Sequence, residues 1–183
     1  MTNKKIFPWK IISTKRIYVN PWLKVREDKI IQPTGEKGIY GVIEISPAVG
    51  VIPIDDKGKI ILLKHWRYPA KKISIEIPLG GINKNETPLA AAKRELFEET
   101  GYKAKKWKFL GSFESSNCLT TDLAKVYLAK ELYQDNKIEH QERFLEGIKI
   151  MKVGLRTVIN LVKNNKITES ISKGTILLYL YFK

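Results

Sequence analysis

Three glutamates in the segment that spans residues 80–102 are spaced so that they could act together. Glu95, Glu98 and Glu99 stand at positions i, i+3 and i+4, which share one side of an α-helix. Neighbouring carboxylates repel one another in a bare helix by roughly a few tenths of a kcal/mol per pair. The repulsion is tolerable on a solvated face, the common interpretation of such a cluster. It is reversed when divalent cations such as Mg²⁺ lie among the oxygens.

The residues around these glutamates add features that suit a phosphate or a metal ion. Arg94 directly precedes Glu95, and its guanidinium could orient the carboxylates or hold negative charge of a substrate. Upstream, Gly80 and Gly81 follow Leu79 in a predicted loop, and glycine lets the backbone approach a ligand closely. The segment therefore combines acidic, basic and backbone groups within one loop and one helix.

The spacing of the whole segment is more specific than any of its parts. It runs Gly80, five residues, Glu86, seven residues, Arg94-Glu95-Leu96, one residue, Glu98-Glu99, one residue, Gly101-Tyr102. This pattern is the Nudix box, and the chain resembles the Nudix hydrolase family. It departs from the family pattern at Tyr102, where a bulky aliphatic residue is usual.

The resemblance implies an α/β/α sandwich with a mixed sheet, in which the box forms a loop, a helix and a second loop at the catalytic centre. It also implies metal-dependent hydrolysis of a nucleoside diphosphate linked to another moiety, with Mg²⁺ or Mn²⁺ as the cofactor. In such enzymes the helix glutamates bind the metal ions, which makes Glu95 and Glu99 the first-choice ligands. Glu98 would share metal or water contacts and act in catalysis with Glu99, and the carbonyl of Leu79 could complete a metal site.

The remaining residues of the box are implied to support it. Gly80 and Gly81 shape the substrate-binding loop, Glu86 and Arg94 hold the box together through ion pairing, and Gly101 ends the helix.

Three further segments, PWLKVRED, AVGVIPIDDKGKIILLKHWRYP and IEIPLGG, resemble the ADP-ribose pyrophosphatase branch of the family, and the likeness covers most of the chain. It implies that Arg67 helps to bind the substrate diphosphate, with a structural ion pair as the alternative role. Glu76 could likewise face the site or serve as a salt-bridge partner.

Enzymes of this branch are commonly homodimers in which the N-terminal strands contribute to the interface and to nucleoside binding. Trp9 and Trp22 are therefore candidates for stacking on a base, although packing in the core or in a dimer would account for either one. A late loop contains Glu139 and Glu142. In this branch a glutamate of that loop can act as a base or an additional metal contact, and Glu142 is better placed for it.

The segment after the box bears on the substrate. ADP-ribose hydrolases typically carry a Pro-Gly-containing loop there, whereas residues 113–120 read FESSNCLT. This weakens the ADP-ribose assignment and leaves GDP-mannose or another ADP-sugar open. Cys118 has no histidine near it in the sequence, which argues against a cysteine nucleophile.

The sequence thus predicts hydrolysis of the pyrophosphate bond of a nucleotide sugar such as ADP-ribose, giving a nucleoside monophosphate and a sugar phosphate. The alternatives are a GDP-mannose or other nucleotide pyrophosphatase, including one that processes RNA, and a non-catalytic Nudix-fold protein that binds nucleotides or RNA. The complete set of three glutamates favours an enzyme.

The elements that must position these residues suggest a mixed α/β or α+β domain. Strands are predicted at residues 9–18, 23–31, 39–45, 48–54, 59–65, 73–77, 107–113 and 123–129. Thr87 and Pro88 predict the start of the box helix and Gly101 its end, with Leu89, Ala92 and Leu96 packed on the sheet. A second helix is predicted from the apolar spacing of Leu155, Val158, Ile159 and Val162. Residues 176–182 could form a strand or a helix.

Composition sets the broad class. The chain has 183 residues, of which 43% are hydrophobic and 28% charged, as in ordinary globular proteins. We expect residues 1–45 to form an N-terminal strand extension with dimer contacts and residues 46–183 to form the Nudix domain. One cysteine suits a reducing compartment, and no apolar run reaches the roughly 20 residues that span a bilayer, so we expect a cytoplasmic protein without a membrane partner.

The net charge of +14 is compatible with a phosphorylated ligand without identifying one. Only six of the 33 basic residues are arginine, and the lysines are scattered along the chain, which is typical of solvated side chains. Nucleic acid is therefore a disfavoured but open partner.

Overall fold

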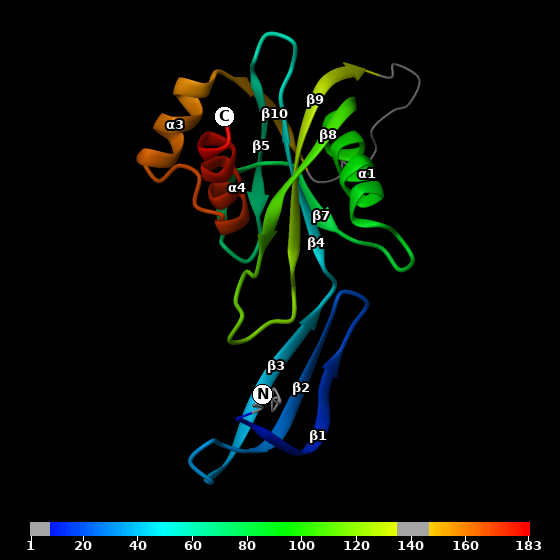
Figure 1. Ribbon diagram of the computed structural model, residues 1–183, viewed down its shortest axis with the longest axis vertical. Helices are drawn as coiled ribbons and strands as arrows, with labels where there is room; N and C mark the ends of the chain where they lie inside the picture. The colour runs from blue at the N-terminus through cyan, green and yellow to red at the C-terminus, as the bar shows by residue number, and fades with distance from the viewer. Residues whose placement is uncertain (1–7, 135–146) are drawn as a thin grey trace, which may run out of the picture. The chain divides into compact units, whose positions relative to one another are not determined.

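The computed structural model describes residues 8–134 and 147–183 (Figure 1). The strands are β1 (Lys10–Val19), β2 (Leu23–Ile31), β3 (Lys37–Ile45), β4 (Ala48–Pro53), β5 (Ile60–Arg67), β6 (Lys72–Glu76), β7 (Leu79–Gly81), β8 (Tyr102–Phe113), β9 (Ala124–Gln134) and β10 (Lys149–Val153). The helices are α1 (Pro88–Thr100), α3 (Leu155–Lys163) and α4 (Ser170–Tyr181). None of the helices in these two ranges is long and apolar enough to cross a membrane.

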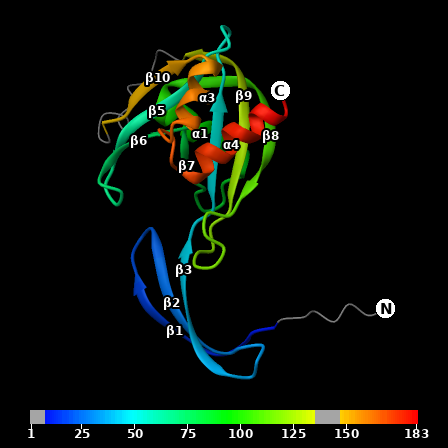
Figure 2. The same ribbon diagram turned by 90° about the vertical axis from the view of Figure 1, so that its left-hand side faces the viewer.

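The chain divides into two compact units, one of residues 1–46 and 116–122, the other of residues 47–115 and 123–183. In the first unit, β1, β2 and β3 form an antiparallel meander (Figure 2). The segment 116–122 joins this meander, because the amide of Ile43 donates to the carbonyl of Leu119 and the amide of Thr121 donates to the carbonyl of Ile43. The division into an N-terminal extension of residues 1–45 and a Nudix domain of residues 46–183 remains a prediction.

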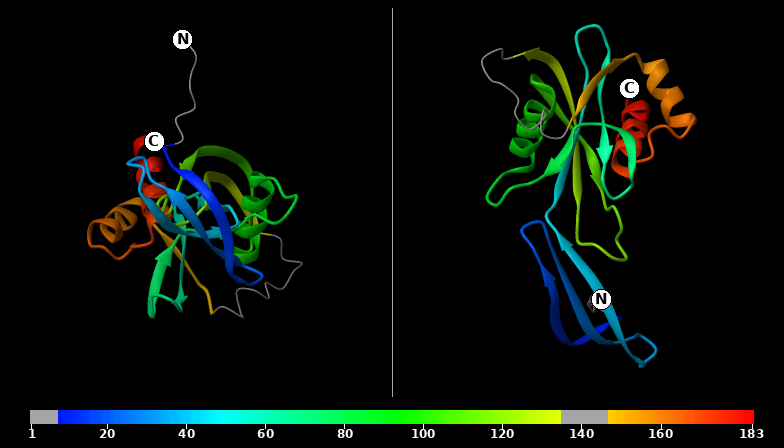
Figure 3. Two further views of the ribbon diagram at one scale, coloured as in Figure 1. Left: turned by 90° about the horizontal axis from the view of Figure 1, so that it is seen from below. Right: turned by 180° about the vertical axis from the view of Figure 1, so that it is seen from behind.

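The second unit contains two sheets. One has the strand order β7-β4-β9-β8 and is mixed, because β4 and β9 run parallel while the other pairs are antiparallel. The other has the order β10-β5-β6 and is antiparallel throughout. Helix α1 lies on one side of the sheets, and α3 and α4 lie on the other (Figures 1 and 3). The predicted sandwich of mixed α and β structure is confirmed.

Strand β4 contributes side chains to both apolar cores of this sandwich. Its side chains alternate between the two faces, as strand geometry requires. Val49 and Val51 pack in the cluster that includes Ala92 and Leu96 of α1. Ile52 packs in the opposite cluster, with residues of α3 and α4. The strand is therefore buried on both faces, which explains its continuous apolar sequence.

Helix α1 begins and ends where its sequence predicts. The hydroxyl of Thr87 accepts a hydrogen bond from the amide of Ala90, and Pro88 occupies the first helical position. Gly101 stops the helix in the left-handed conformation, with φ of 76°, and its amide donates to the carbonyl of Phe97. These caps fix the residues at which the helix begins and ends, and hence the positions of its glutamates along the helix axis.

The buried side of α1 differs from the prediction in one respect. Ala92 and Leu96 are fully buried as expected, but Leu89 is exposed. The buried side runs instead through Ala91, Ala92, Glu95, Leu96, Glu99 and Thr100. It thus includes two of the three glutamates of α1, Glu95 and Glu99, which are not on a solvated face.

Three other elements depart from the expectations. In β6 the polar side chains of Ser74 and Glu76 are buried, whereas Ile73 is exposed. The glycines after Leu79 do not lie in a plain loop but form the short strand β7, paired with β4. Residues 176–182, which fit a strand or a helix, mostly belong to α4, whose first turn is capped by the carboxylate of Glu169.

Candidate catalytic site

Arg94 connects the acidic residues of the box. Its Nε and Nη2 donate to the two carboxylate oxygens of Glu86 at 3.0 and 2.9 Å. Its Nη1 donates to Glu95 at 2.7 Å and to Glu98 at 2.8 Å, and Nη2 also donates to the carbonyl of Gly81 at 2.8 Å. One guanidinium therefore joins the loop to three carboxylates, and it offsets part of their mutual repulsion.

Charge pairing in this group shifts two pKa values. The hydrogen bond from Arg94 and the backbone amide of Asn83 lower the pKa of Glu86. The same bond to Glu86, together with those to Glu95 and Glu98, raises the pKa of Arg94 despite its partial burial. Both groups remain charged over the whole physiological pH range, so the pairing persists.

Glu95 is packed against the glycine that opens the box. Its side chain is largely buried, and a Cβ built on Gly80 would lie 2.1–2.2 Å from its carboxyl atoms. A separation that short is far inside van der Waals contact, so the carboxylate can occupy this place only because residue 80 has no side chain. A Cβ on the neighbouring Gly81 would meet nothing within 4 Å.

Glu99 and Glu98 complete the acidic side of α1. Glu99 is 7% exposed, and one carboxylate oxygen accepts a hydrogen bond from the amide of Leu79 at 3.1 Å. Glu98 is more open, with 29% of its side chain exposed. The structure thus brings Glu95, Glu98 and Glu99 together with Leu79 and the box loop.

The donor chemistry of this group fits a divalent cation. Carboxylate oxygens are the hard ligands that Mg²⁺ and Mn²⁺ prefer, and burying two carboxylates is costly unless positive charge compensates them. Within the described residues, no three His, Cys, Asp or Glu side chains already stand in a metal-binding arrangement. The Arg94 bonds to Glu95 and Glu98 occupy one oxygen of each.

The departure from the box pattern at Tyr102 has a structural reason. The ring is buried beside the end of α1, and its hydroxyl accepts a hydrogen bond from the ammonium of Lys152 on β10. That ammonium also lies 4.9 Å from the ring centroid. A tyrosine fits here because its polar end has a partner.

A second charged group lies on β5 and β6. Arg67 donates to Glu76 through Nε at 3.2 Å and through Nη2 at 2.6 Å, and the ring of the buried His65 lies 3.3 Å from the same carboxylate. Burial by itself would raise the pKa of Glu76. Hydrogen bonds from His65, Arg67 and Ser74, with the charge of Arg67, lower it to about 2 instead. Glu76 thus forms a salt bridge with Arg67, which is one of the two roles that the sequence allowed for it.

This pKa predicts a pH dependence of stability. Because the folded-state value lies below the ordinary 4.5, the stabilisation is complete above pH 4.5 and is lost as the pH falls toward 2. In chemical denaturation, the free-energy gap between wild type and Glu76→Gln should narrow by up to roughly 2 kcal/mol between pH 6 and pH 3. Glu114 is exposed, so the difference in unfolding free energy between the wild type and Glu114→Gln should not change between pH 6 and pH 3. An unchanged gap for Glu76→Gln would contradict the assigned ionisation.

Arg67 and Glu76 also line a pocket of about 460 Å³. Its other lining residues are Pro69, Ala70, Lys72, Ser74, Leu79, Thr168 and Glu169. Leu79 therefore connects the two groups. It lines this pocket, and its backbone amide donates the hydrogen bond to Glu99 in the acidic group. A cation, hydroxyl groups and an apolar wall beside the acidic group could hold a phosphorylated molecule.

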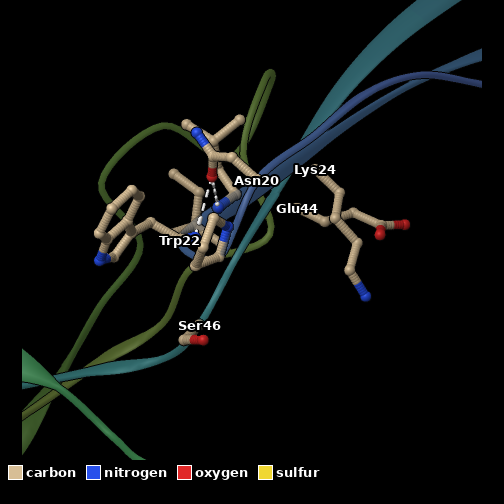
Figure 4. A pocket seen from close by; sticks show the side chains of 8 residues that line it. Asn20, Trp22, Lys24, Glu44 and Ser46 are labelled. Carbon is tan, nitrogen blue, oxygen red and sulfur yellow. Dashed lines mark hydrogen bonds between the residues drawn. The ribbon is translucent and has the colours of Figure 1, made fainter.

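Trp22 lies in the first unit and lines a pocket of about 320 Å³ there (Figure 4). The side-chain oxygen of Asn20 accepts hydrogen bonds from the amides of Trp22 at 2.9 Å and Leu23 at 2.8 Å, which fixes the turn before β2. The indole is 78% exposed, so core packing does not explain it within the described residues. Trp9 is also exposed and makes an edge contact with Tyr40.

The predicted catalytic residue Glu142 and its alternative in the same loop, Glu139, lie outside the described residues. Other residues were missed by the sequence reasoning, namely His65 and Ser74 beside Glu76. The register of the β5–β6 hairpin could have indicated them, because it places His65 directly opposite Ser74. The hydrogen bond between Lys72 and Thr168, which are 96 residues apart, had no sequence signal.

Family models match two parts of the chain. The NUDIX domain model matches residues 45–153, and the model for a nucleoside diphosphate sugar hydrolase N-terminal domain matches residues 9–43. The first match includes every residue of the box and also Arg67 and Glu76. The second includes Trp9 and Trp22.

Two similar proteins come from bacilli. A methanol dehydrogenase activator of Bacillus methanolicus is 30% identical over 91% of this chain and 89% of its own length. An ADP-ribose pyrophosphatase of Bacillus subtilis is 30% identical over 88% of this chain and 86% of its own length. The crystal structure of an ADP compounds hydrolase superposes with a TM-score of 0.80, covering 95% of this chain and 93% of the other at 18% identity. That structural likeness establishes the fold.

Proposed function

Because the chain belongs to the Nudix family, we propose that it hydrolyses the pyrophosphate bond of a nucleoside diphosphate linked to a sugar. ADP-ribose is the first candidate substrate, in keeping with the ADP-ribose pyrophosphatase of Bacillus subtilis. The observation that carries the proposal is the group around Arg94, in which Glu95 and Glu99 are held almost buried beside the box glycines. Such a group suits pyrophosphate chemistry better than passive binding.

In the proposed reaction, water adds to one phosphorus and the bridging P–O bond breaks. The products are a nucleoside monophosphate and a sugar phosphate, and the proton of the water passes to a base. Glu98 is our candidate for this base among the described residues, because its carboxylate is the most exposed of the three on α1. Glu142 remains the second candidate, from its place in the sequence.

We propose that Glu95 and Glu99 hold Mg²⁺ or Mn²⁺, that Glu98 shares metal or water contacts, and that the carbonyl of Leu79 is a further ligand. When bound, such an ion neutralises the pyrophosphate and lowers the pKa of a coordinated water. Arg94 would keep the carboxylates in place through its bonds to Glu86 and to the loop carbonyl.

Arg67 would bind the substrate diphosphate. Its side chain is 37% exposed although it pairs with Glu76, and it lines the pocket of about 460 Å³. The pair with Glu76 pre-orients the guanidinium, which lowers the entropy lost when an anion binds. The ion pair with Glu76 and the binding of substrate would then use the same position of the Arg67 side chain.

Trp22 would stack on the base of the nucleotide. The indole is exposed and therefore accessible to a base, and stacking on an aromatic ring contributes about 1–3 kcal/mol per base. The substitution Trp22→Ala is the direct test of this role, because it should raise KM while kcat changes little.

The function is tested by phosphate release with Mg²⁺ and a coupled phosphatase. The panel contains ADP-ribose, GDP-mannose, other nucleotide sugars, NADH, diadenosine polyphosphates and damaged nucleoside triphosphates. The Glu98→Gln/Glu99→Gln variant is the blank. We expect turnover of a nucleotide sugar that vanishes in this variant. Silence across the panel, repeated with Mn²⁺ and with triphosphate-ended RNA, would favour a binding protein instead.

We also propose that the protein is a cytoplasmic homodimer that associates through β1–β3. All ten residues of β1 are exposed, and they include the large apolar side chains of Ile11, Ile12 and Ile17. Such an exposed apolar surface is typical of an interface. The single cysteine suits the reducing compartment.

The dimer predicts a difference between two variants of β1. Sedimentation equilibrium should give about 42 kDa for the wild type, twice the chain mass of 21.1 kDa. Ile11→Glu should shift the mass toward one chain, because it buries a charge in the interface. Ser13→Glu adds the same charge at a polar exposed position and should shift it less. A wild type of one chain mass would refute the dimer.

A further inference from the structure

A lysine-rich hollow lies on β8 and β9, and its residues are different from those around Arg67 and the box. It has a volume of about 490 Å³ and is lined by Lys105, Lys106, Trp107, Lys108, Leu128 and Lys130. We call it the lysine pocket. Four lysines therefore line this hollow, and its other two lining residues, Trp107 and Leu128, are apolar or aromatic.

The strand register concentrates this charge. Lys106 of β8 stands directly opposite Lys130 of β9, and Lys108 lies two residues farther along β8 opposite Leu128. Like charges in directly opposite positions destabilise an antiparallel pair. One acidic side chain moderates the repulsion, because Glu131 forms an ion pair with Lys106 at 2.5 Å. The pKa of Lys106 is raised by this hydrogen bond, so the group stays charged.

Protection of a sheet edge accounts for only part of the cluster. In the described residues β8 is the outer strand of the order β7-β4-β9-β8, and lysine on an outer strand discourages pairing with another chain. That explanation covers Lys105, Lys106 and Lys108. It does not cover Lys130, which lies on the inner strand β9 and completes the pocket.

We propose that the lysine pocket binds a small anion that carries several phosphate charges. Ammonium groups are strongly hydrated point charges without the fork of arginine, so several of them must act together on a multiply charged ligand. The volume lies in the range of pockets for small molecules. The ligand would also relieve the repulsion between Lys106 and Lys130. This site does not depend on the proposed hydrolysis.

Inorganic tripolyphosphate is the ligand for the test, with a chelator present so that no divalent ion can hold it at the box. Isothermal titration calorimetry compares the full-length wild type with Lys106→Gln/Lys130→Gln. The matched control is Lys64→Gln/Lys149→Gln, which also removes two exposed lysines that stand directly opposite across an antiparallel pair. Both variants lose the same charge, and neither changes a residue that we place in the catalytic machinery.

We expect the Lys106→Gln/Lys130→Gln variant to bind tripolyphosphate at least about tenfold more weakly, and the control within about twofold of the wild type. Affinity in the wild type should fall with added salt. Equal losses in both variants would mean that only net charge matters and would overturn the site, as would no binding by the wild type. An oligonucleotide that binds more tightly than tripolyphosphate, and is lost in the same variant, would replace the small anion with a nucleic-acid backbone.

Discussion

Glu99→Gln should reduce the rate of nucleotide-sugar hydrolysis by about a thousandfold. The amide oxygen of glutamine can still accept the hydrogen bond that Leu79 now donates to Glu99 at 3.1 Å, so the local structure should persist. What disappears is one negative charge of a proposed metal ligand. Metal ions contribute several kcal/mol to transition states of this kind, and about 4 kcal/mol corresponds to a factor of a thousand. Steady-state kinetics over a range of Mg²⁺ concentrations would measure the loss.

The control for this variant is Glu36→Gln, an exposed carboxylate in the turn between β2 and β3. It removes the same charge at the same size and should leave kcat within about twofold. Both variants should retain the melting temperature of the wild type to within a few degrees. A Glu99→Gln enzyme that keeps more than about a tenth of the activity would remove Glu99 from the metal-binding set.

Gly80→Ala should abolish most of the activity while the protein still folds. The new methyl group would coincide with the carboxyl group of Glu95, 2.1–2.2 Å from its atoms. The carboxylate is the far end of a side chain and can move aside, so the main consequence is a displaced ligand rather than an unfolded chain. Displacement of a catalytic group by about 1 Å costs on the order of a hundredfold in rate.

Gly81→Ala is the matched control, because the same methyl group one residue later meets nothing within 4 Å. We expect it to keep clearly more activity than Gly80→Ala, because the added methyl group does not meet Glu95. The comparison is made on kcat with far-ultraviolet circular dichroism as the check on folding. Equal activity of the two alanine variants would show that Glu95 does not need its present position.

The parts of the fold that local sequence controls could be predicted closely. Helix α1 starts after Thr87 and stops at Gly101, as predicted, because its caps are made by residues adjacent to the helix. The grouping of the box glutamates on one side follows from helical spacing alone. The burial of Glu95 and Glu99 does not, because it depends on β4 and β7 packing against that side of α1.

Features that depend on distant segments could not be predicted. The burial of Ser74 and Glu76 reverses the apolar face expected for β6, because His65 and Arg67 on β5 supply partners for the carboxylate. Helix α4 was ambiguous because residues 176–182 are apolar nearly throughout. Its conformation is set by the Glu169 cap and by packing on β8.

The pairing of residues 116–122 with β3 has a consequence during protein synthesis. Tyr40 donates its hydroxyl proton to the carbonyl of Cys118, 78 residues farther along the chain. At roughly 5–20 residues per second, a ribosome delivers that partner about 4–16 s after the strand itself. The β3 groups that bond to Leu119 and Thr121 therefore have no partner from residues 116–122 until that later segment has been synthesised.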